Sequence, residues 1–211
     1  MNYKVIYGKN DLVYTGFLAL PGKLYQKNEL TQDYDTEYKL LHEKHTLSKY
    51  FNITPFVVID KNSQMPVARC MLTYYPEDDV AYFGFFECIG QQEIAEQLLD
   101  TVSKKAKKDG KTKLSGPVDA SFWIKYRLKI NLFDRIPYTG EPYNKNYLTG
   151  FPYHSIYGLL TAFYPAAGKL IVVIFQAVYH GNLVVYNDNT SGRIANKCVC
   201  TFLVIFLIHL K

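Results

Sequence analysis

The sequence predicts an α/β fold in which a mixed, mostly antiparallel sheet is flanked by helices, and three consecutive segments carry that prediction. Val80–Ile89 is rich in aromatic and β-branched residues and has one charge, which is typical of a central strand buried on both faces. From Gln91 to Lys108 the apolar residues recur at helical spacing, with acids at the start and lysines at the end, as the helix dipole favours. Lys111–Pro117 then predicts a second strand, parallel or nearly parallel to the first because a helix connects them.

Three further strands are predicted before this unit. Thr54–Asp60 and Pro66–Tyr75 are joined by a short polar turn, and residues 76–79 form the turn that leads into the Val80 strand. Consecutive strands with such short connections predict an antiparallel meander. Tyr3–Tyr7 alternates well enough to predict a first strand nearer the edge of the sheet.

Helices are predicted in three other segments. Asn10 can cap a helix that runs to Leu18 and is broken by the following Pro-Gly pair, and shorter helices are predicted at Tyr34–His45 and Asp119–Phe133. The polar, tyrosine-rich stretch from residue 23 to 50 has two interpretations that the sequence leaves open. It is either a substrate-side region with many hydrogen-bonding rings or a surface helix pair that covers one sheet edge.

Bulk properties exclude several classes of function. The 211 residues carry a net charge of +5, and 48% are hydrophobic, enough for a domain with a core. Six lysines lie between Lys104 and Lys113, but a solvated helix end explains them more simply than an anionic partner, so nucleic-acid binding is not favoured. The four cysteines lack metal-ligand spacing, so no metal is expected. The amino terminus lacks signal-peptide features, so we expect a cytoplasmic protein.

The junction between the Val80 strand and the following helix is where backbone geometry predicts a ligand. A helix that begins directly after a strand leaves its first N–H groups unpaired, and its dipole adds positive potential there. A phosphate can therefore bind at this turn. The alternative is a purely structural junction, because any α/β protein has such turns.

The order of hairpin, strand, turn, helix and strand resembles the core of the GCN5-related N-acetyltransferase (GNAT) superfamily. The details are most similar to its bacterial N-acyltransferase-like branch, over roughly residues 3–148. The motifs that carry the resemblance are Gly84-Phe-Phe-Glu87, Ala95-Glu-Gln-Leu-Leu99, Gly116-Pro117 with Ser121 nearby, and Tyr143-Asn-Lys-Asn-Tyr147.

The resemblance implies transfer of an acyl group to an amine, with acetyl-CoA or another acyl-CoA as co-substrate. In that superfamily the fourth and fifth strands splay apart, pantetheine lies in the gap, and the pyrophosphate binds on the turn before the helix. Carried onto this chain, the resemblance places pantetheine along Phe86 and Cys88, pyrophosphate at Ile89, Gly90, Gln91 and Gln92, and Asn144 against the pantetheine amides.

Glu87 is the candidate general base, and Tyr147 is the candidate acid toward the leaving thiolate. Glu87 is the only acid in an otherwise apolar strand, and burial would raise its pKa toward a useful value. The alternative for Glu87 is a strand-end carboxylate paired with a lysine. For Tyr147 and Asn144 the alternatives are a packed aromatic ring and a helix cap. Rival bases are His42, His45 and His154.

The expected acceptor is a small-molecule or peptide amine. A homodimer is possible, and neither nucleic acid nor a membrane is an expected partner.

The alternative function is a non-catalytic GNAT-fold domain that binds a ligand or a protein. The weakened phosphate turn and the lack of a clear base pair favour that alternative. The turn Ile89–Ala95 has a single glycine, and Glu93 places a negative charge close to the proposed phosphates.

The composition changes at about residue 148. Of the 24 basic and 19 acidic residues, only five lie beyond residue 150. Strands are predicted at Leu170–Phe175 and Leu183–Tyr186, and the apolar run Cys198–Leu210 is shorter than the roughly 20 residues of a transmembrane helix. We therefore divide the chain into an acyltransferase-like core, residues 1–148, and an atypical segment, residues 149–211, whose sequence is compatible with a shifted reading frame. On this hypothesis the core lacks its closing strand pair.

Overall fold

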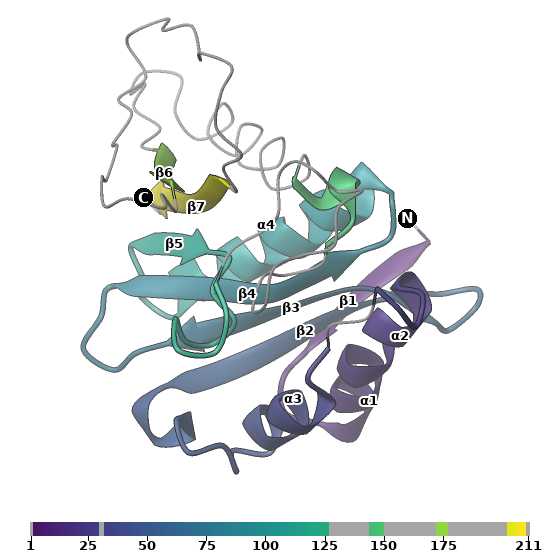
Figure 1. The fold of residues 1–211 in the computed structure, drawn as a ribbon, viewed down its shortest axis with the longest axis horizontal. Helices are drawn as coiled ribbons and strands as arrows, with labels where there is room; N and C mark the ends of the chain where they lie inside the picture. Colours follow the sequence, from purple (N-terminus) through teal and green to yellow (C-terminus); the bar gives the residue numbers. More distant parts are fainter. Residues whose placement is uncertain (1, 30–31, 127–143, 150–171, 177–201, 210–211) are drawn as a thin grey trace, which may run out of the picture.

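The computed structural model describes residues 2–29, 32–126, 144–149, 172–176 and 202–209. Within these residues lies a seven-stranded sheet in which every neighbouring pair is antiparallel except β4 and β5, which are parallel (Figure 1). The predicted fold class is confirmed, and β4 is the central strand. In spatial order the strands are β1 (Tyr3–Tyr7), β2 (Asn52–Asp60), β3 (Pro66–Tyr74), β4 (Val80–Cys88), β5 (Lys113–Gly116), β7 (Phe202–His209) and β6 (Val172–Gln176).

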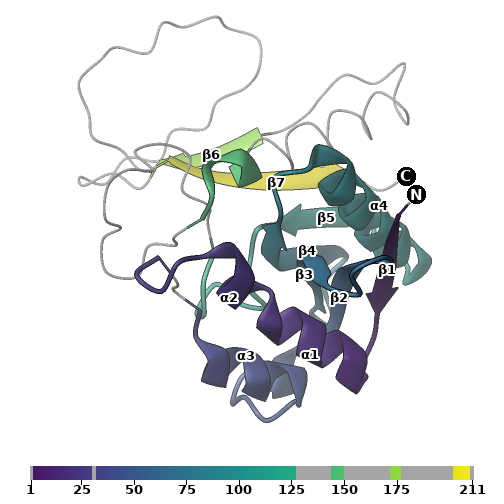
Figure 2. The ribbon, with the colours of Figure 1, turned by 90° about the vertical axis from the view of Figure 1, so that its right-hand side faces the viewer.

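Helices cover both faces of the sheet (Figures 1 and 2). On one face α4 (Gln92–Lys108) buries its apolar side, including Ile94 and Leu98, in a core shared with the strands. On the other face α1 (Asp11–Ala19) and α3 (Tyr34–Leu41) form a second core, to which they contribute Phe17 and Leu40. The short helix α2 (Pro21–Leu24) follows α1. The central strand is therefore covered on both faces, as its composition predicts.

Local signals set the ends of the first helices. The Asn10 side chain accepts a hydrogen bond from Val13 N (3.1 Å), which confirms the predicted N-cap. Pro21 does more than end α1, because its fixed φ suits the first position of a helix and α2 begins there. Asp33 caps α3 by accepting from Thr36 N (3.0 Å), and α3 ends at Leu41, before the predicted end at His45.

The predicted helix Asp119–Phe133 is wrong over its described part, which forms turns and an isolated bridge between Val118 and Tyr126. Two features oppose a helix there. The Asp119 carboxylate is held by a distant backbone amide, and Ala120 has a φ of 60°. Residues 127–133 lie outside the described part of the chain.

The tail contributes two strands to the sheet. β7 pairs with β5, with Lys113 opposite His209 and Gly116 opposite Phe206, and β6 pairs with β7. The expectation that the closing strand pair is missing is therefore wrong. The predicted strand at residues 170–175 overlaps β6, and the one at 183–186 lies outside the described residues. No helix in the described part of the chain is long and apolar enough to cross a membrane.

Candidate active site

β4 and β5 pair over three residues at the start of β4 and then separate. The segment after β5 stays close to β4 for a short distance: Val118 N donates to Phe83 O (2.8 Å), and the Asp119 carboxylate accepts from Phe85 N (2.6 Å). Beyond these contacts, Phe86–Cys88 have no hydrogen-bonded neighbour on this side among the described residues. The parallel pair is thus open at the carboxyl end of β4, where the resemblance places pantetheine.

A β-bulge in β4 decides which way Glu87 points. Met71 of β3 lies opposite Gly84 and Arg69 lies opposite Glu87, so two residues of β4 oppose one residue of β3 between these pairs. Side chains alternate along a strand, and Phe83 belongs to the core beneath α4. The extra residue therefore moves Glu87 to the opposite face, which α1 and α3 cover.

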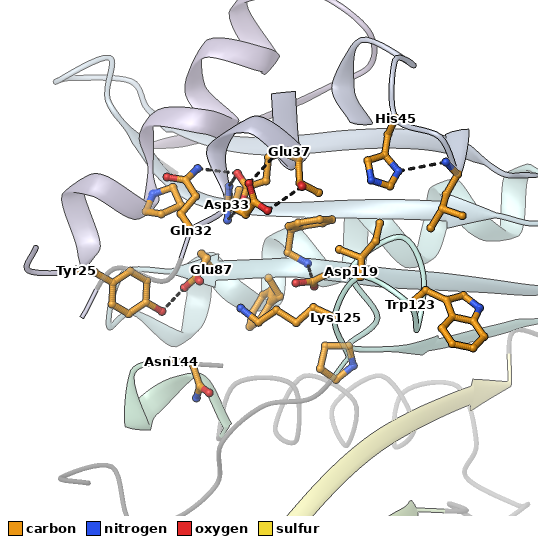
Figure 3. Close-up of a pocket in the computed structure, with 18 of the residues that line it drawn as sticks. Tyr25, Gln32, Asp33, Glu37, His45, Glu87, Asp119, Trp123, Lys125 and Asn144 are labelled. Carbon is orange, nitrogen blue, oxygen red and sulfur yellow. Dashed lines mark hydrogen bonds and ion pairs between the residues drawn. The ribbon is translucent and has the colours of Figure 1, made fainter. Parts of the chain in front are cut away.

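On that face Glu87 lines a cavity of about 480 Å³ between the sheet, the α2–α3 region and the loop that follows β5 (Figure 3). Its volume lies within the range of small-molecule sites. The Tyr25 hydroxyl donates to Glu87 Oε2 (2.6 Å), and the other carboxylate oxygen has no hydrogen-bond partner among the described residues. Figure 3 shows Tyr25 and Glu87 at one end of the cavity and Trp123, which is 89% exposed, at the other. A ligand entering past Trp123 can therefore reach a carboxylate oxygen.

The surroundings of Glu87 suit a general base. Burial raises the pKa of Glu87 to about 7, against the smaller effects of the Arg69 charge and the Tyr25 hydrogen bond, which lower it. Burial and the adjacent carboxylate raise the pKa of Tyr25, so its hydroxyl remains a donor. A carboxyl group with a pKa near neutrality can both take up and release a proton. The predicted alternative, an ion pair between Glu87 and a lysine, is not formed within the described residues.

A buried ion pair borders the same cavity. Arg69 Nη1 and Nη2 donate to the two carboxylate oxygens of Glu37 (2.7 and 3.0 Å), and Nη1 also donates to Phe17 O (3.0 Å). Gln32 Nε2 donates to Glu37 Oε2 (2.6 Å) and to Leu18 O (3.1 Å). The side chains of Arg69 and Glu37 are only 4% and 5% exposed, so they form a nearly dry, fully engaged pair.

Asp119 and Lys125 bring further charge to the cavity from the loop after β5. One Asp119 oxygen accepts from Phe85 N, and burial raises the pKa of this carboxyl group. Lys125 makes no side-chain hydrogen bond or ion pair with the described residues. The cavity is lined by four carboxyl groups, those of Asp33, Glu37, Glu87 and Asp119, and by two cations, Arg69 and Lys125. The excess of acidic groups suits a cationic ligand.

The turn between β4 and α4 is open, as predicted. Gly90, Gln91 and Gln92 are exposed, and no side chain caps the start of α4. The backbone N–H groups of Gly90, Gln92, Glu93 and Ile94 have no hydrogen-bond partner among the described residues. These amides and the helix dipole favour an anion there, whereas the exposed Glu93 carboxylate in the first turn opposes one.

Of the other residues predicted to bind the donor, three lie in or against the core and two lie at the turn between β4 and α4. Phe86 and Cys88 are buried in the core beneath α4, and Ile89 packs against that core. The Gln91 side chain accepts from Tyr3 OH (2.9 Å), and Gln92 donates to Glu96 (2.7 Å).

Tyr147 lies within a short 3₁₀ helix, Asn146–Thr149, and Asn144 lies just before it. The Tyr147 ring lies next to Gly90 and packs against the α4 core, and burial, with smaller effects of Cys88 and Glu87, raises the pKa of this phenol to about 12. Asn144 is buried and lines the cavity with Glu87, two residues before the 3₁₀ helix. The structure therefore brings Asn144 together with Glu87 and places Tyr147 at the turn between β4 and α4.

The rival bases differ in position. His45 lines the cavity and accepts from Leu47 N (3.2 Å). His42 stacks on Tyr38 with ring centroids 4.1 Å apart, outside the cavity lining. His154 lies outside the described residues.

The polar stretch from residue 23 to 50, for which a substrate-side region was one interpretation, supplies Tyr25, Gln32 and Glu37 to the cavity. Sequence reasoning missed Arg69, Asp119 and Lys125. Arg69 had a usable signal, because it is the only charge in an otherwise apolar strand, as Glu87 is in the next one. The others lie in polar stretches where nothing distinguishes them from surface residues.

Comparison with solved structures identifies the architecture. An N-acetyltransferase from Staphylococcus aureus Mu50 aligns with 98% of this chain and 97% of its own at a TM-score of 0.51 and 8% identity. The chain has the GNAT fold. A GNAT-family acetyltransferase from the same strain (TM-score 0.45, 12% identity, 99% and 100% of the two chains) and yncA, an acetyltransferase from Salmonella typhimurium with acetyl-CoA (0.46, 10%, 100% and 95%), align over similar lengths.

Sequence comparisons add nothing to this result, because no protein-family model and no curated protein matches the chain. At such low identity the GNAT fold is what the similarity establishes, so the reaction has to be inferred from the site.

Proposed function

We propose that this protein is an acyl-CoA-dependent N-acyltransferase that moves an acyl group to an amine, with Glu87 as the general base. The observation that carries the proposal is the position of Glu87. The bulge turns its carboxylate into the cavity, one of its oxygens has no hydrogen-bond partner among the described residues, and burial raises its pKa to about 7. The residue lies beside the point where β4 loses its parallel neighbour.

The donor fits the open side of β4. Phe86–Cys88 would hold the pantetheine arm along the strand edge that has no neighbour among the described residues. The backbone amides of Gly90, Gln92 and Glu93, which have no partner in that part of the chain, would hold the pyrophosphate. Asn144, which lines the same cavity, is the proposed contact for the pantetheine amides. The Glu93 carboxylate would weaken phosphate binding.

The reaction needs no covalent enzyme intermediate. Glu87 takes a proton from the bound ammonium, and the neutral nitrogen attacks the thioester carbonyl. The carbon–sulfur bond then breaks to release coenzyme A, and the nitrogen loses its second proton, which replaces the one that the thiolate takes from its proton donor. Tyr147 is the proposed proton donor to the departing thiolate, since burial raises the pKa of its hydroxyl to about 12, which keeps it protonated at neutral pH, and it lies close enough to Glu87 for the two groups to interact. Orientation of the two substrates and one general base supply most of the rate.

Binding of the donor is tested by thermal unfolding of the full chain with acetyl-CoA and with a long-chain acyl-CoA. A ligand at 100 times its dissociation constant stabilises the folded state by about 2.7 kcal/mol, so a clear rise in melting temperature is expected. No rise with either thioester would remove the transferase proposal and favour the non-catalytic binding domain.

The role of Glu87 is tested by Glu87→Gln in an assay of coenzyme A release with a panel of amines. We expect kcat/KM to fall about 10²- to 10⁴-fold, with unchanged affinity for acetyl-CoA. In the unmodified protein kcat/KM should rise with pH and level off above about 7, because only the ionised carboxylate accepts a proton. Glu77→Gln, at an exposed acid outside this cavity, is the matched control and should retain full activity.

A further inference from the structure

Arg69 and Glu87 are directly opposite each other in the β3–β4 pair, and both side chains lie on the α1–α3 face. Residues in such positions have Cβ atoms about 4.5–5.5 Å apart, and opposite charges there ordinarily attract each other. These two residues do not bond. Glu87 accepts from Tyr25, and Arg69 donates to Glu37 and to Phe17 O.

The guanidinium of Arg69 is held away from Glu87 by several contacts. Glu37 of α3 accepts from both of its terminal nitrogens, and Gln32 donates to Glu37 and fixes that carboxylate in turn. The Phe17 ring lies 4.5 Å from the guanidinium carbon, and the Phe85 ring lies 5.9 Å from it. Arg69 Nε is buried without a partner among the described residues.

We propose that Glu37 is a positioning residue that acts on Glu87 through Arg69, by keeping the guanidinium occupied so that the opposite carboxylate stays free to accept a proton. This inference rests on the proposed function, because it assigns a purpose to the free carboxylate. The charged and titratable groups around Glu87 in the described part of the chain are Arg69 on β3, Tyr25 after α2, Asp33 and Glu37 at α3, His45 after α3, Asp119 and Lys125 after β5, Cys88 on β4, Lys145 over the Tyr25 ring, and Tyr147.

Removal of the charge on Glu37 should redirect Arg69. A buried guanidinium without its carboxylate partner is strongly destabilised, and the carboxylate directly opposite Arg69 in the strand pair is that of Glu87. A direct ion pair would hold Glu87 in its ionised form and lower its pKa by about 1–3 units. A weaker base that is already bonded to a cation accepts the amine proton poorly.

The experiment is Glu37→Gln, followed by NMR titration of the carbon-13-labelled Glu87 carboxyl group, assigned with Glu87→Gln. The expected result is a midpoint near 7 in the unmodified protein and a midpoint lower by about one unit or more in Glu37→Gln. The pH profile of kcat/KM should shift by the same amount with a plateau about 10-fold lower, and the affinity for acetyl-CoA should stay unchanged. Asp35→Asn is the matched control, because Asp35 is an exposed acid on the same helix that pairs with Lys39.

A second variant guards against loss of folding. Glu37→Leu combined with Arg69→Met removes the pair together with its charge, an exchange that proteins often tolerate. It should raise the Glu87 midpoint, the opposite sign to Glu37→Gln, because the stabilising cation is gone. A midpoint that is the same in all variants would overturn the inference even if transfer is intact. Absence of transfer with the expected shifts would instead reject the proposed function.

Discussion

At the scale of single residues, Glu87 makes the folded protein sensitive to pH. Its pKa rises from about 4.3 in an unfolded chain to about 7 in the folded state. The protonated carboxyl is therefore favoured by folding. The stability it contributes is present in full below the unfolded pKa and is lost as pH rises through 7. The ionised form of Glu87 therefore lowers the free energy of unfolding, and the proposed role as a base would explain why a carboxylate lies at this position.

Glu87→Gln should consequently be more stable than the unmodified protein at alkaline pH. We expect the free energy of unfolding to be higher by about 2 kcal/mol at pH 8.5, after allowance for partial exposure of the side chain. Each kcal/mol raises the melting temperature of a chain of this size by about 2–4 °C. At pH 5, about two units below the folded pKa, most of this difference should be gone. Calorimetry at both pH values measures this, with Glu77→Gln as the control, and equal melting at pH 8.5 would contradict the assigned environment of Glu87.

The sequence indicated Glu87 but not its surroundings. One acid in an apolar strand is a visible signal, whereas the direction of its side chain depends on a bulge at Phe85, whose φ of 49° is unusual for a non-glycine residue. Strict alternation from Phe83 would have turned Glu87 toward α4. Tyr25 and Arg69 reach Glu87 only through tertiary packing, so their partnership with it is invisible along the chain.

At the scale of elements, the start of α4 carries opposing contributions. Its free amides and dipole attract an anion, and Glu93 in the first turn repels one. Glu93→Gln should therefore bind coenzyme A about 2- to 5-fold more tightly, as measured by isothermal titration calorimetry. Glu96→Gln, one turn further along, should change the affinity little. If Glu93→Gln binds no better, the phosphates are not at this turn.

The contact between β4 and the loop after β5 depends on Gly84. A Cβ atom at this position would overlap the Val118 carbonyl oxygen and neighbouring backbone, which cannot move aside as a flexible side chain can. Gly84→Ala should lower the free energy of unfolding by about 1–3 kcal/mol or more, measured with urea. Gly22→Ala is the matched control, since nothing lies within 4 Å of a Cβ there, and a small stabilisation is expected from higher helix propensity.

Most elements were predictable because periodicity and turn residues agree with the packing. The four strands before α4, and α4 itself, occur where the sequence predicts them. The exception is the segment after β5, where Phe122, Trp123 and Tyr126 suggested one face of a helix. Tertiary contacts outweighed that pattern, because Asp119 is bonded to Phe85 N and Tyr75 OH donates to Ala120 O (3.1 Å).

At the scale of the whole molecule, the sheet contains strands from both ends of the chain, β1 and β7. β5 has β4 on one side over three residues and β7 on the other over four. Truncation after Thr149 would leave the backbone of β5 exposed as an edge. We expect the truncated protein to unfold at lower urea concentration and to aggregate. Equal stability of the truncated and full-length proteins would support the proposed division into a core, residues 1–148, and a separate tail. Sequencing of the source locus would test independently whether the tail arises from a shifted reading frame.

The bulge in β4 has a consequence for how this site can be lost. Glu87 faces Tyr25 because of the number of residues that precede it in the strand. Many point substitutions nearby would leave that orientation intact, and so would deletion of Phe85, because a regular strand would then keep Glu87 opposite Arg69. A strand of unchanged length that lost the bulge would instead turn the carboxylate into the core beneath α4. The direction of the proposed base therefore depends on the extra residue being accommodated as a bulge.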